Sequence, residues 1–167
     1  MAHETDANPC HTPGWPAGFD LELRRRFDAP PEKIWQAWMT PDLLKQWFCP
    51  CPWRVSEATI DPRPGGVFNT VMNGPNGEVM PNTGVFLEVV PGRKWITTDA
   101  FAPGWKPTGL PFMVAEVTLT PTEDGGTDYV AIARHWSADT MKQHEQMGFH
   151  QGWGAAADQL AELLRTL

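Results

Sequence analysis

The spacing of apolar residues predicts a long amphipathic helix over residues 137–167. Its second half carries apolar side chains at steps of three and four, which places them on one stripe of the helix: Phe149, Trp153, Ala156, Leu160, Leu163 and Leu167. On the same stripe and its margin, the first half carries Met141, Lys142, Glu145, Gly148 and Gly152. A helix whose first half presents polar or very small residues inward is expected to cover a partly hollow interior.

Strand patterns occupy most of the chain before this helix. Apolar and polar residues alternate over residues 19–28, which is typical of a half-buried strand. Two short helices are expected next, within residues 31–48, where prolines stand at first-turn positions and Trp35, Trp38 and Trp47 would hold the helices on a sheet. Six further strands are expected at about residues 53–61, 67–73, 83–90, 94–101, 112–120 and 127–136.

This order of elements predicts an α+β fold with an antiparallel sheet of seven strands. A meander of that many strands twists and curls, so one face of the sheet becomes concave. The C-terminal helix is long enough to cross that face, and residues 102–111, rich in Pro, Gly and Trp, are expected to form a loop. The space between helix and sheet is then either a packed core or a pocket.

Length and composition suit one domain. The chain has 167 residues, 41% of them hydrophobic, which is enough to fill one core. Residues 1–18 show little apolar periodicity and are expected to form a tail, with the domain in residues 19–167. No apolar run reaches the roughly eighteen residues that span a bilayer. The first residues also lack the pattern of a signal peptide, so a cytoplasmic location and reduced cysteines are expected.

The formal net charge of -7 argues against a nucleic-acid or anionic-membrane surface, because phosphate binding needs clustered Lys and Arg. The one basic run, Arg24 to Arg26, lies in a predicted strand, where successive side chains point to opposite faces. Nine Trp residues accompany a single Tyr. Large buried aromatic side chains dominate core energetics, so the Trp residues are expected to build the core.

Five segments of the chain together resemble one known family. They are IWQAWMTPDLLKQWF from Ile34, DPRPGGVFNTVMNGPNGE from Asp61, GVFLEVVPGRKW from Gly84, GGTDYVAIARHW from Gly125 and HEQMGFHQGWGAAADQLAELL from His144. They follow in order over nearly everything after residue 19. The sequence is similar to the AHSA-like branch, homologues of the heat-shock chaperone ATPase activator, of the START-like or SRPBCC superfamily. The resemblance implies a Bet v 1-like helix-grip fold, in which a curved antiparallel sheet holds a long C-terminal helix.

Glu145 is a candidate binding residue, because a carboxylate on the inward stripe must meet a partner, water or a ligand. Lys142 lies three residues earlier and could pair with it, so an internal or rim salt bridge is the alternative. His144 and His150 fall on opposite flanks of the stripe and are expected to be solvated. The open half of the helix adds further candidates for the cavity wall: Met141, Gly148, Phe149 and Gly152.

The last predicted strand divides its side chains into two sets. The more apolar set is expected to face the interior and consists of Val130, Ile132, Arg134 and Trp136. The other set consists of Tyr129, Ala131, Ala133 and His135. An inward Arg134 could bind an anionic ligand, or it could neutralise Glu145 or Asp99. Asp99 is also a candidate ligand-binding residue.

Metal and cofactor motifs are not expected. His3, Cys10 and His11 fit no standard metal site. Cys49 and Cys51 are separated by one residue and lack the spacing and the second pair that thiolate ligation needs. The chain also has no nucleophile elbow, phosphate loop or dinucleotide fingerprint.

Three functions stay open on this basis. The main prediction is the binding of a small apolar or amphipathic molecule between sheet and helix. An enzyme of the polyketide cyclase or hydrolase kind could use the same pocket, with Glu145 or His135 as acid or base, although no positioned pair of titratable groups is recognisable. A chaperone-regulating role is the third, but a fold resemblance does not carry that contact with it. The protein is expected to be a monomer or a homodimer.

Overall fold

The structure, a computed structural model, describes residues 18–109 and 111–167. Its helices are α1 (Pro31–Met39), α2 (Pro41–Leu44), α3 (Ala138–Gln146) and α4 (Phe149–Leu164). Its strands are β1 (Asp20–Phe27), β2 (Arg54–Ile60), β3 (Phe68–Asn73), β4 (Val79–Asn82), β5 (Val85–Val90), β6 (Lys94–Thr98), β7 (Phe101–Ala102), β8 (Lys106–Pro107), β9 (Val114–Pro121) and β10 (Thr127–Arg134). The predicted α+β class is confirmed, with two short helices after the first strand and helices at the C-terminal end.

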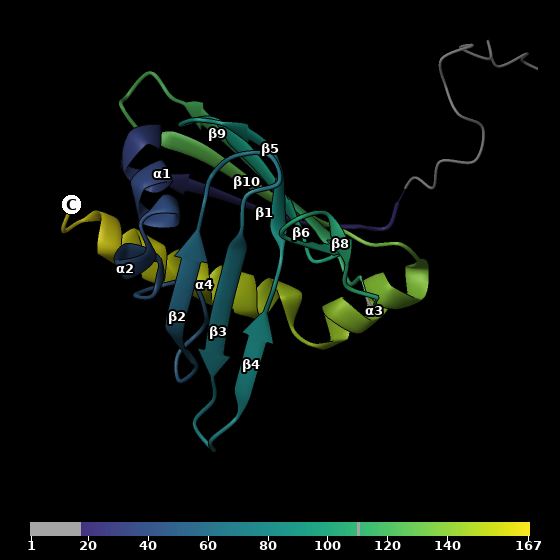
Figure 1. Cartoon of the computed structure of the whole chain (residues 1–167). Coiled ribbons are helices and arrows are strands. Elements are labelled where there is room, and N and C mark those ends of the chain that lie inside the picture. The colour runs from purple at the N-terminus through teal and green to yellow at the C-terminus, as the bar shows by residue number, and fades with distance from the viewer. Residues whose placement is uncertain (1–17, 110) are drawn as a thin grey trace, which may run out of the picture.

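All strand pairs are antiparallel. One sheet has the order β1-β10-β9-β6-β5, a second has the order β2-β3-β4, and β7 pairs with β8. The two larger sheets join where Val67 bridges Val85 and the Phe86 N–H donates to the Gly66 carbonyl oxygen at 2.9 Å. Figure 1 shows α4 crossing the resulting surface, with α1 and α2 near its C-terminal end.

The number of strands differs from the prediction. The segment expected as one strand over residues 83–90 contains only β5, and β4 precedes it in the other sheet. The chain changes sheets at Gly84, where a Cβ atom would lie 2.6 Å from the Thr98 carbonyl oxygen, so only glycine fits the close approach. The segment expected as a loop over residues 102–111 contains the end of a small hairpin, β7-β8.

The prediction of one continuous C-terminal helix is wrong. The helix ends after Gln146 and restarts at Phe149, and Gly148 between the two parts has φ 94° and ψ 40°. These are left-handed angles, which glycine adopts without the steric cost that a Cβ atom brings. The Gly148 N–H donates to the Glu145 carbonyl oxygen at 3.0 Å and closes the end of α3. Because of this break, the inward face of α3 does not continue the inward face of α4.

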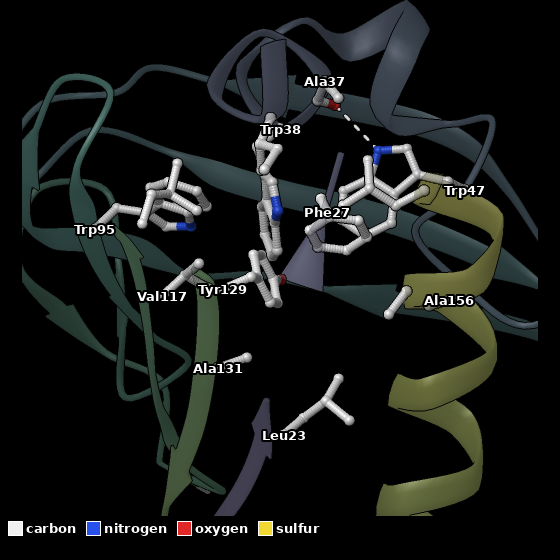
Figure 2. Close-up of a cluster of buried hydrophobic side chains, with 14 of the residues drawn as sticks. Leu23, Phe27, Ala37, Trp38, Trp47, Trp95, Val117, Tyr129, Ala131 and Ala156 are labelled. Carbon is white, nitrogen blue, oxygen red and sulfur yellow. Dashed lines mark hydrogen bonds between the residues drawn. The ribbon is translucent and has the colours of Figure 1, made fainter. Parts of the chain in front are cut away.

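Aromatic side chains fill the end of the interior beneath α1 and α2. Trp38 lies between Trp95 and Trp47 in Figure 2, with ring centroids 5.1 Å and 5.0 Å from its own. The Trp47 indole N–H donates to the Ala37 carbonyl oxygen at 3.1 Å, so its one polar group is satisfied inside the core. Trp35 also packs against Trp95. The prediction that the tryptophans hold the two short helices on the sheet is confirmed.

The inward face of β10 is the opposite of the predicted one. Tyr129, Ala131 and Ala133 are buried, whereas Val130, Ile132 and Arg134 are only partly buried on the other face. Trp136, just after the strand, is 51% exposed. The small alanines of this face belong to the buried core on the concave side, so side-chain hydrophobicity alone indicated the wrong face.

The stripe predicted on the second half of the C-terminal helix is confirmed. Phe149, Ala156 and Leu160 are buried, and Trp153, Leu163 and Leu167 pack partly buried against the core. No helix in the described ranges is long and apolar enough to cross a membrane. His3, Cys10 and His11, which were rejected as metal ligands, lie outside the described residues.

Candidate ligand-binding cavity

A cavity of about 380 Å³ lies between the concave side of the sheets and the C-terminal helices. The end of α1, the segment after α2, strands β1, β3, β6, β9 and β10, the segments after β4 and β6, and helices α3 and α4 all contribute to its wall. Most of the larger wall residues are aromatic or sulfur-containing: Trp38, Trp47, Phe48, Phe68, Met72, Phe112, Met113, Phe149 and Trp153. Such a wall suits an apolar molecule.

Very small residues on α4 keep the cavity open. Gly152, Ala156 and Ala157 all line it. A Cβ atom on Gly152 would meet only the Pro50 ring, at 4.0 Å. Figure 2 shows Ala156 pointing from α4 toward the interior, where Leu23 and Tyr129 lie. Larger side chains at these positions would occupy the space that the fold leaves between helix and sheet.

Two histidines meet at the polar end of the cavity. His135 follows β10 directly, and its Nδ1 lies 2.8 Å from the Phe19 carbonyl oxygen. Its Nε2 lies 2.9 Å from Nδ1 of His144, which belongs to α3 and lines the cavity. The His144 ring also packs against Phe112, Phe149 and Trp153. Hydrogen bonding and aromatic packing together fix the orientation of this ring.

His144 is neutral at physiological pH in this environment. Burial, and secondarily the neighbouring His135, lower its pKa from the ordinary 6.5 to about 4. The imidazole therefore offers one N–H and one lone pair rather than a positive charge. Burial also raises the pKa of the Tyr129 hydroxyl, another group on the cavity wall, so this phenol stays protonated.

Asp99 supplies a carboxylate to the same wall. The backbone N–H of Phe112 donates to its Oδ1 at 2.9 Å, and the N–H of Met113 donates to the same oxygen at 3.2 Å. These bonds fix the carboxylate at the start of β9. The neighbouring Thr98 hydroxyl donates to the Met113 carbonyl oxygen at 3.1 Å.

Two other polar groups on the wall lack a hydrogen-bond partner within residues 18–109 and 111–167: Trp38 Nε1 and Thr70 Oγ1. Thr70 is buried in β3, and Trp38 is buried at the end of α1. A buried hydroxyl or indole N–H without a partner costs free energy. A bound molecule could satisfy either group.

The described wall contains a carboxylate but no basic side chain of Lys or Arg. Its ionisable residues are Cys49, Asp99, Tyr129 and His144, and no Lys or Arg lines it in the described part of the chain. Burial raises the pKa of the Cys49 thiol, and the nearby Cys51 adds to this effect. In the same ranges, no three His, Cys, Asp or Glu side chains form a group that could hold a metal ion. In its described residues, the site therefore offers hydrogen-bond donors and acceptors but no cationic side chain of Lys or Arg.

Some of the predicted site residues come together here. Asp99, Gly148, Phe149 and Gly152 line the cavity. Met141 packs against the core but is not part of the wall. His135 is also outside the wall. Both of its ring nitrogens make hydrogen bonds within the protein, one with the Phe19 carbonyl oxygen and one with His144.

Glu145 does not face the interior, and this prediction is wrong. Its side chain is 56% exposed, and the ionisable side chain that it meets is His150, at 4.0 Å, rather than Lys142. The expectation assumed one continuous stripe, whereas the break at Gly148 turns α3 relative to α4. The same break brings His144 inward, so the expectation that His144 is solvated is also wrong.

Arg134 lies on the face of β10 away from the cavity. Its guanidinium pairs with Glu116 of β9 and lies 3.7 Å from Asp20 of β1. Partial burial works to raise the pKa of Glu116, but the bonds from Arg134 and Lys94 outweigh it and hold that pKa below its usual value. Arg134 joins strands and cannot serve as the inward anion-binding group that the sequence suggested.

The residues that sequence reasoning missed are His144, Trp38, Thr70 and Tyr129. The signal for His144 was Gly148, a residue able to end a helix, together with the other histidine on the small-residue face of the last strand. Recognising that signal requires knowing that the two histidines meet in space.

A curved antiparallel sheet closed by a C-terminal helix over an apolar cavity is the helix-grip architecture of the Bet v 1-like or SRPBCC superfamily. The sequence pattern described as "Activator of Hsp90 ATPase homolog 1-like protein" matches residues 28–165. The chain belongs to this family. No curated protein matches the sequence.

Solved structures agree with this assignment. A crystal structure of a protein from Nitrosomonas europaea is 44% identical, with 88% of this chain and 94% of the other covered and a TM-score of 0.84. A protein from Mycobacterium smegmatis is 28% identical, with coverages of 87% and 90% and a TM-score of 0.74. A protein from Rhodobacter sphaeroides is 26% identical, with coverages of 91% and 97% and a TM-score of 0.78.

Proposed function

We propose that this protein binds a small, largely apolar molecule in the cavity between the curved sheet and the C-terminal helices. The observation that carries the proposal is the cavity itself, of about 380 Å³ and walled mainly by aromatic side chains. Proteins close-pack their interiors, and a void of this size costs stability. The proposal explains why α4 carries Gly152, Ala156 and Ala157 where larger side chains would fill the space.

The other two functions receive less support. An enzyme using Glu145 or His135 would need them at the cavity wall, and neither is there. A chaperone-regulating role rests on the name of the family, and no surface feature of the described residues favours it over ligand binding. The described cysteines, Cys49 and Cys51, are free thiols, which supports a location in a reducing compartment such as the cytoplasm.

The test is a binding screen with purified protein. Native mass spectrometry and thermal unfolding would measure the binding of naphthalene, cholesterol and n-decanol. A ligand at a hundredfold excess over its Kd should stabilise the protein by about 2.7 kcal/mol, which raises Tm by several degrees. A screen in which none of these molecules binds would contradict the proposal.

A cavity-filling variant locates the binding. Gly152→Phe should abolish binding of every molecule that binds the wild type, because the ring would occupy the cavity that Gly152 lines. Gln151→Phe is the matched control, since this neighbouring position on α4 is exposed and should leave binding unchanged. Arg134→Met should also bind normally, because Arg134 lies on the other face of the sheet.

A further inference from the structure

The hydrogen bonds of His135 determine where its proton lies. The Phe19 carbonyl oxygen can only accept, so His135 Nδ1 must carry the hydrogen that bridges the 2.8 Å between them. The Nε2 of a neutral His135 then holds a lone pair. The hydrogen bond to His144 follows from this, because Nδ1–H of His144 must donate across the 2.9 Å to His135 Nε2.

This chain leaves Nε2 of His144 as an acceptor. The imidazole has used its single hydrogen on His135, so its other nitrogen holds an unshared pair. Nε2 has no hydrogen-bond partner within residues 18–109 and 111–167. The residue is 8% exposed and lines the cavity, and Phe112, Phe149 and Trp153 pack around its ring. An unpaired acceptor on the cavity wall, with its ring held in place in this way, can accept a hydrogen bond from a ligand.

The rest of the wall limits what that donor can belong to. Asp99 is an acceptor, and no Lys or Arg of the described chain lines the cavity. A carboxylate or phosphate on the ligand would lose its hydration, find no cation to pair with and face the Asp99 charge. A hydroxyl group avoids that cost and can donate to the imidazole.

We propose that His144 Nε2 accepts a hydrogen bond from the hydroxyl group of an uncharged, mainly aromatic or aliphatic ligand, and that the cavity thereby prefers such a ligand over its carboxylate analogue. This assignment rests on the proposed ligand-binding function and specifies the chemical class of the ligand. His135 acts as a positioning residue, because it holds the tautomer of His144 and does not itself line the cavity.

Three probes that share one ring system test the preference. Naphthalene, 2-naphthol and 2-naphthoate would be titrated at neutral pH into the full-length protein, with tryptophan fluorescence and calorimetry as readouts. We expect 2-naphthol to bind about tenfold more tightly than naphthalene, as one buried hydrogen bond allows. We expect 2-naphthoate to bind more weakly than both.

Variants show whether His144 carries the preference. His144→Phe should bind naphthalene and 2-naphthol with equal affinity, while His150→Gln on the exposed side of α4 should keep the tenfold difference. The single change leaves His135 Nε2 without its donor and lowers stability. If it fails to fold, the double variant with His135→Phe removes both partners, and the Phe19 carbonyl keeps its bond from the His135 backbone N–H at 3.0 Å.

NMR of nitrogen-labelled histidine tests the tautomer in the wild type. We expect the free protein to show His144 protonated at Nδ1 and unprotonated at Nε2, with the Nε2 resonance moving when 2-naphthol binds and staying when naphthalene binds. A His144 found protonated at Nε2 would overturn the assignment.

The two proposals fail in different ways. Equal binding of naphthalene and 2-naphthol, or tighter binding of 2-naphthoate, would overturn the role of His144 and leave ligand binding intact. Absence of binding by naphthalene and 2-naphthol alike would count against the binding function itself.

Discussion

The two ends of the interior beneath α4 are built from different side chains. At the α1–α2 end, Trp38, Trp47 and Trp95 are at most 9% exposed, and their rings meet edge to face. At the α3–α4 end, Gly148 lies between the two helices and Gly152 lies on α4, and the pair of histidines replaces part of the apolar packing.

The two ends of this interior therefore contribute differently to the stability of the fold. Large buried aromatic groups contribute most of the hydrophobic stabilisation, so the α1–α2 end can hold the fold together. The other end then tolerates small residues and empty space, which cost stability. The comparison can be tested by changing residues at each end and measuring unfolding.

Removing a tryptophan from the packed end should have the largest effect. Trp95→Ala is expected to lower the free energy of unfolding by about 3–5 kcal/mol, because the 1% exposed side chain leaves a large cavity. Urea denaturation measures this. Trp136→Ala is the control, since its side chain is 51% exposed and should change stability by no more than about 0.5 kcal/mol. Similar losses in the free energy of unfolding for both variants would contradict the conclusion that the α1–α2 end holds the fold together.

The contribution of the α3–α4 end to stability should depend on pH. The pKa of His144 is about 4 in the folded protein and about 6.5 when unfolded, so the unfolded chain binds more protons between these values. The stability of the wild type should therefore fall as the pH drops from 6.5 to 4, by up to about 3 kcal/mol from this residue.

The measurement is the free energy of unfolding of the wild type and of His144→Phe across this pH range. His135 contacts His144, so the difference between the two proteins reports the contribution of the histidine pair, while Asp99 of the same cavity is common to both proteins. Parallel pH profiles would show that the buried imidazole is not the source.

A pair of glycine substitutions should give the smallest effects, with opposite signs. Gly148→Ala is expected to destabilise the protein by roughly 1–2 kcal/mol, because φ is 94° there. Gly152→Ala is expected to stabilise it by up to about 1 kcal/mol, because alanine is the better helix former and the added Cβ meets only Pro50 at 4.0 Å. Thermal unfolding compares them. Equal shifts would mean that the helix break is not held by Gly148.

Sequence reasoning predicted the elements well where one strong local pattern was present. Pro31 and Pro41 marked the first turns of α1 and α2, and the stripe from Phe149 to Leu160 marked the inward face of α4. It failed at Gly84 and Gly148, since a single glycine is also common inside regular elements. Whether the chain changes direction there depends on neighbours such as the Thr98 carbonyl, which lies far along the chain.

The candidate site was predicted only in part. Gly148, Phe149, Gly152 and Asp99 line the cavity, and their part in ligand binding stays a prediction. Glu145 was predicted to face inward because the helix was assumed to be continuous. Missing the break at Gly148 therefore led to the wrong inward face for all of α3.

The sequence by itself determined the order of elements, the family and the existence of a helix able to cover the sheet, because these depend on local periodicity and on segment order. Only the tertiary structure decided which face of β10 is buried, since both of its side-chain sets contain apolar residues and packing against the helices selects the smaller one. It also decided the meeting of His135, which follows β10, and His144, which lies in α3 and reaches His135 only when α3 folds back against the end of β10. The space for the cavity also depends on the small residues Gly152, Ala156 and Ala157 of α4.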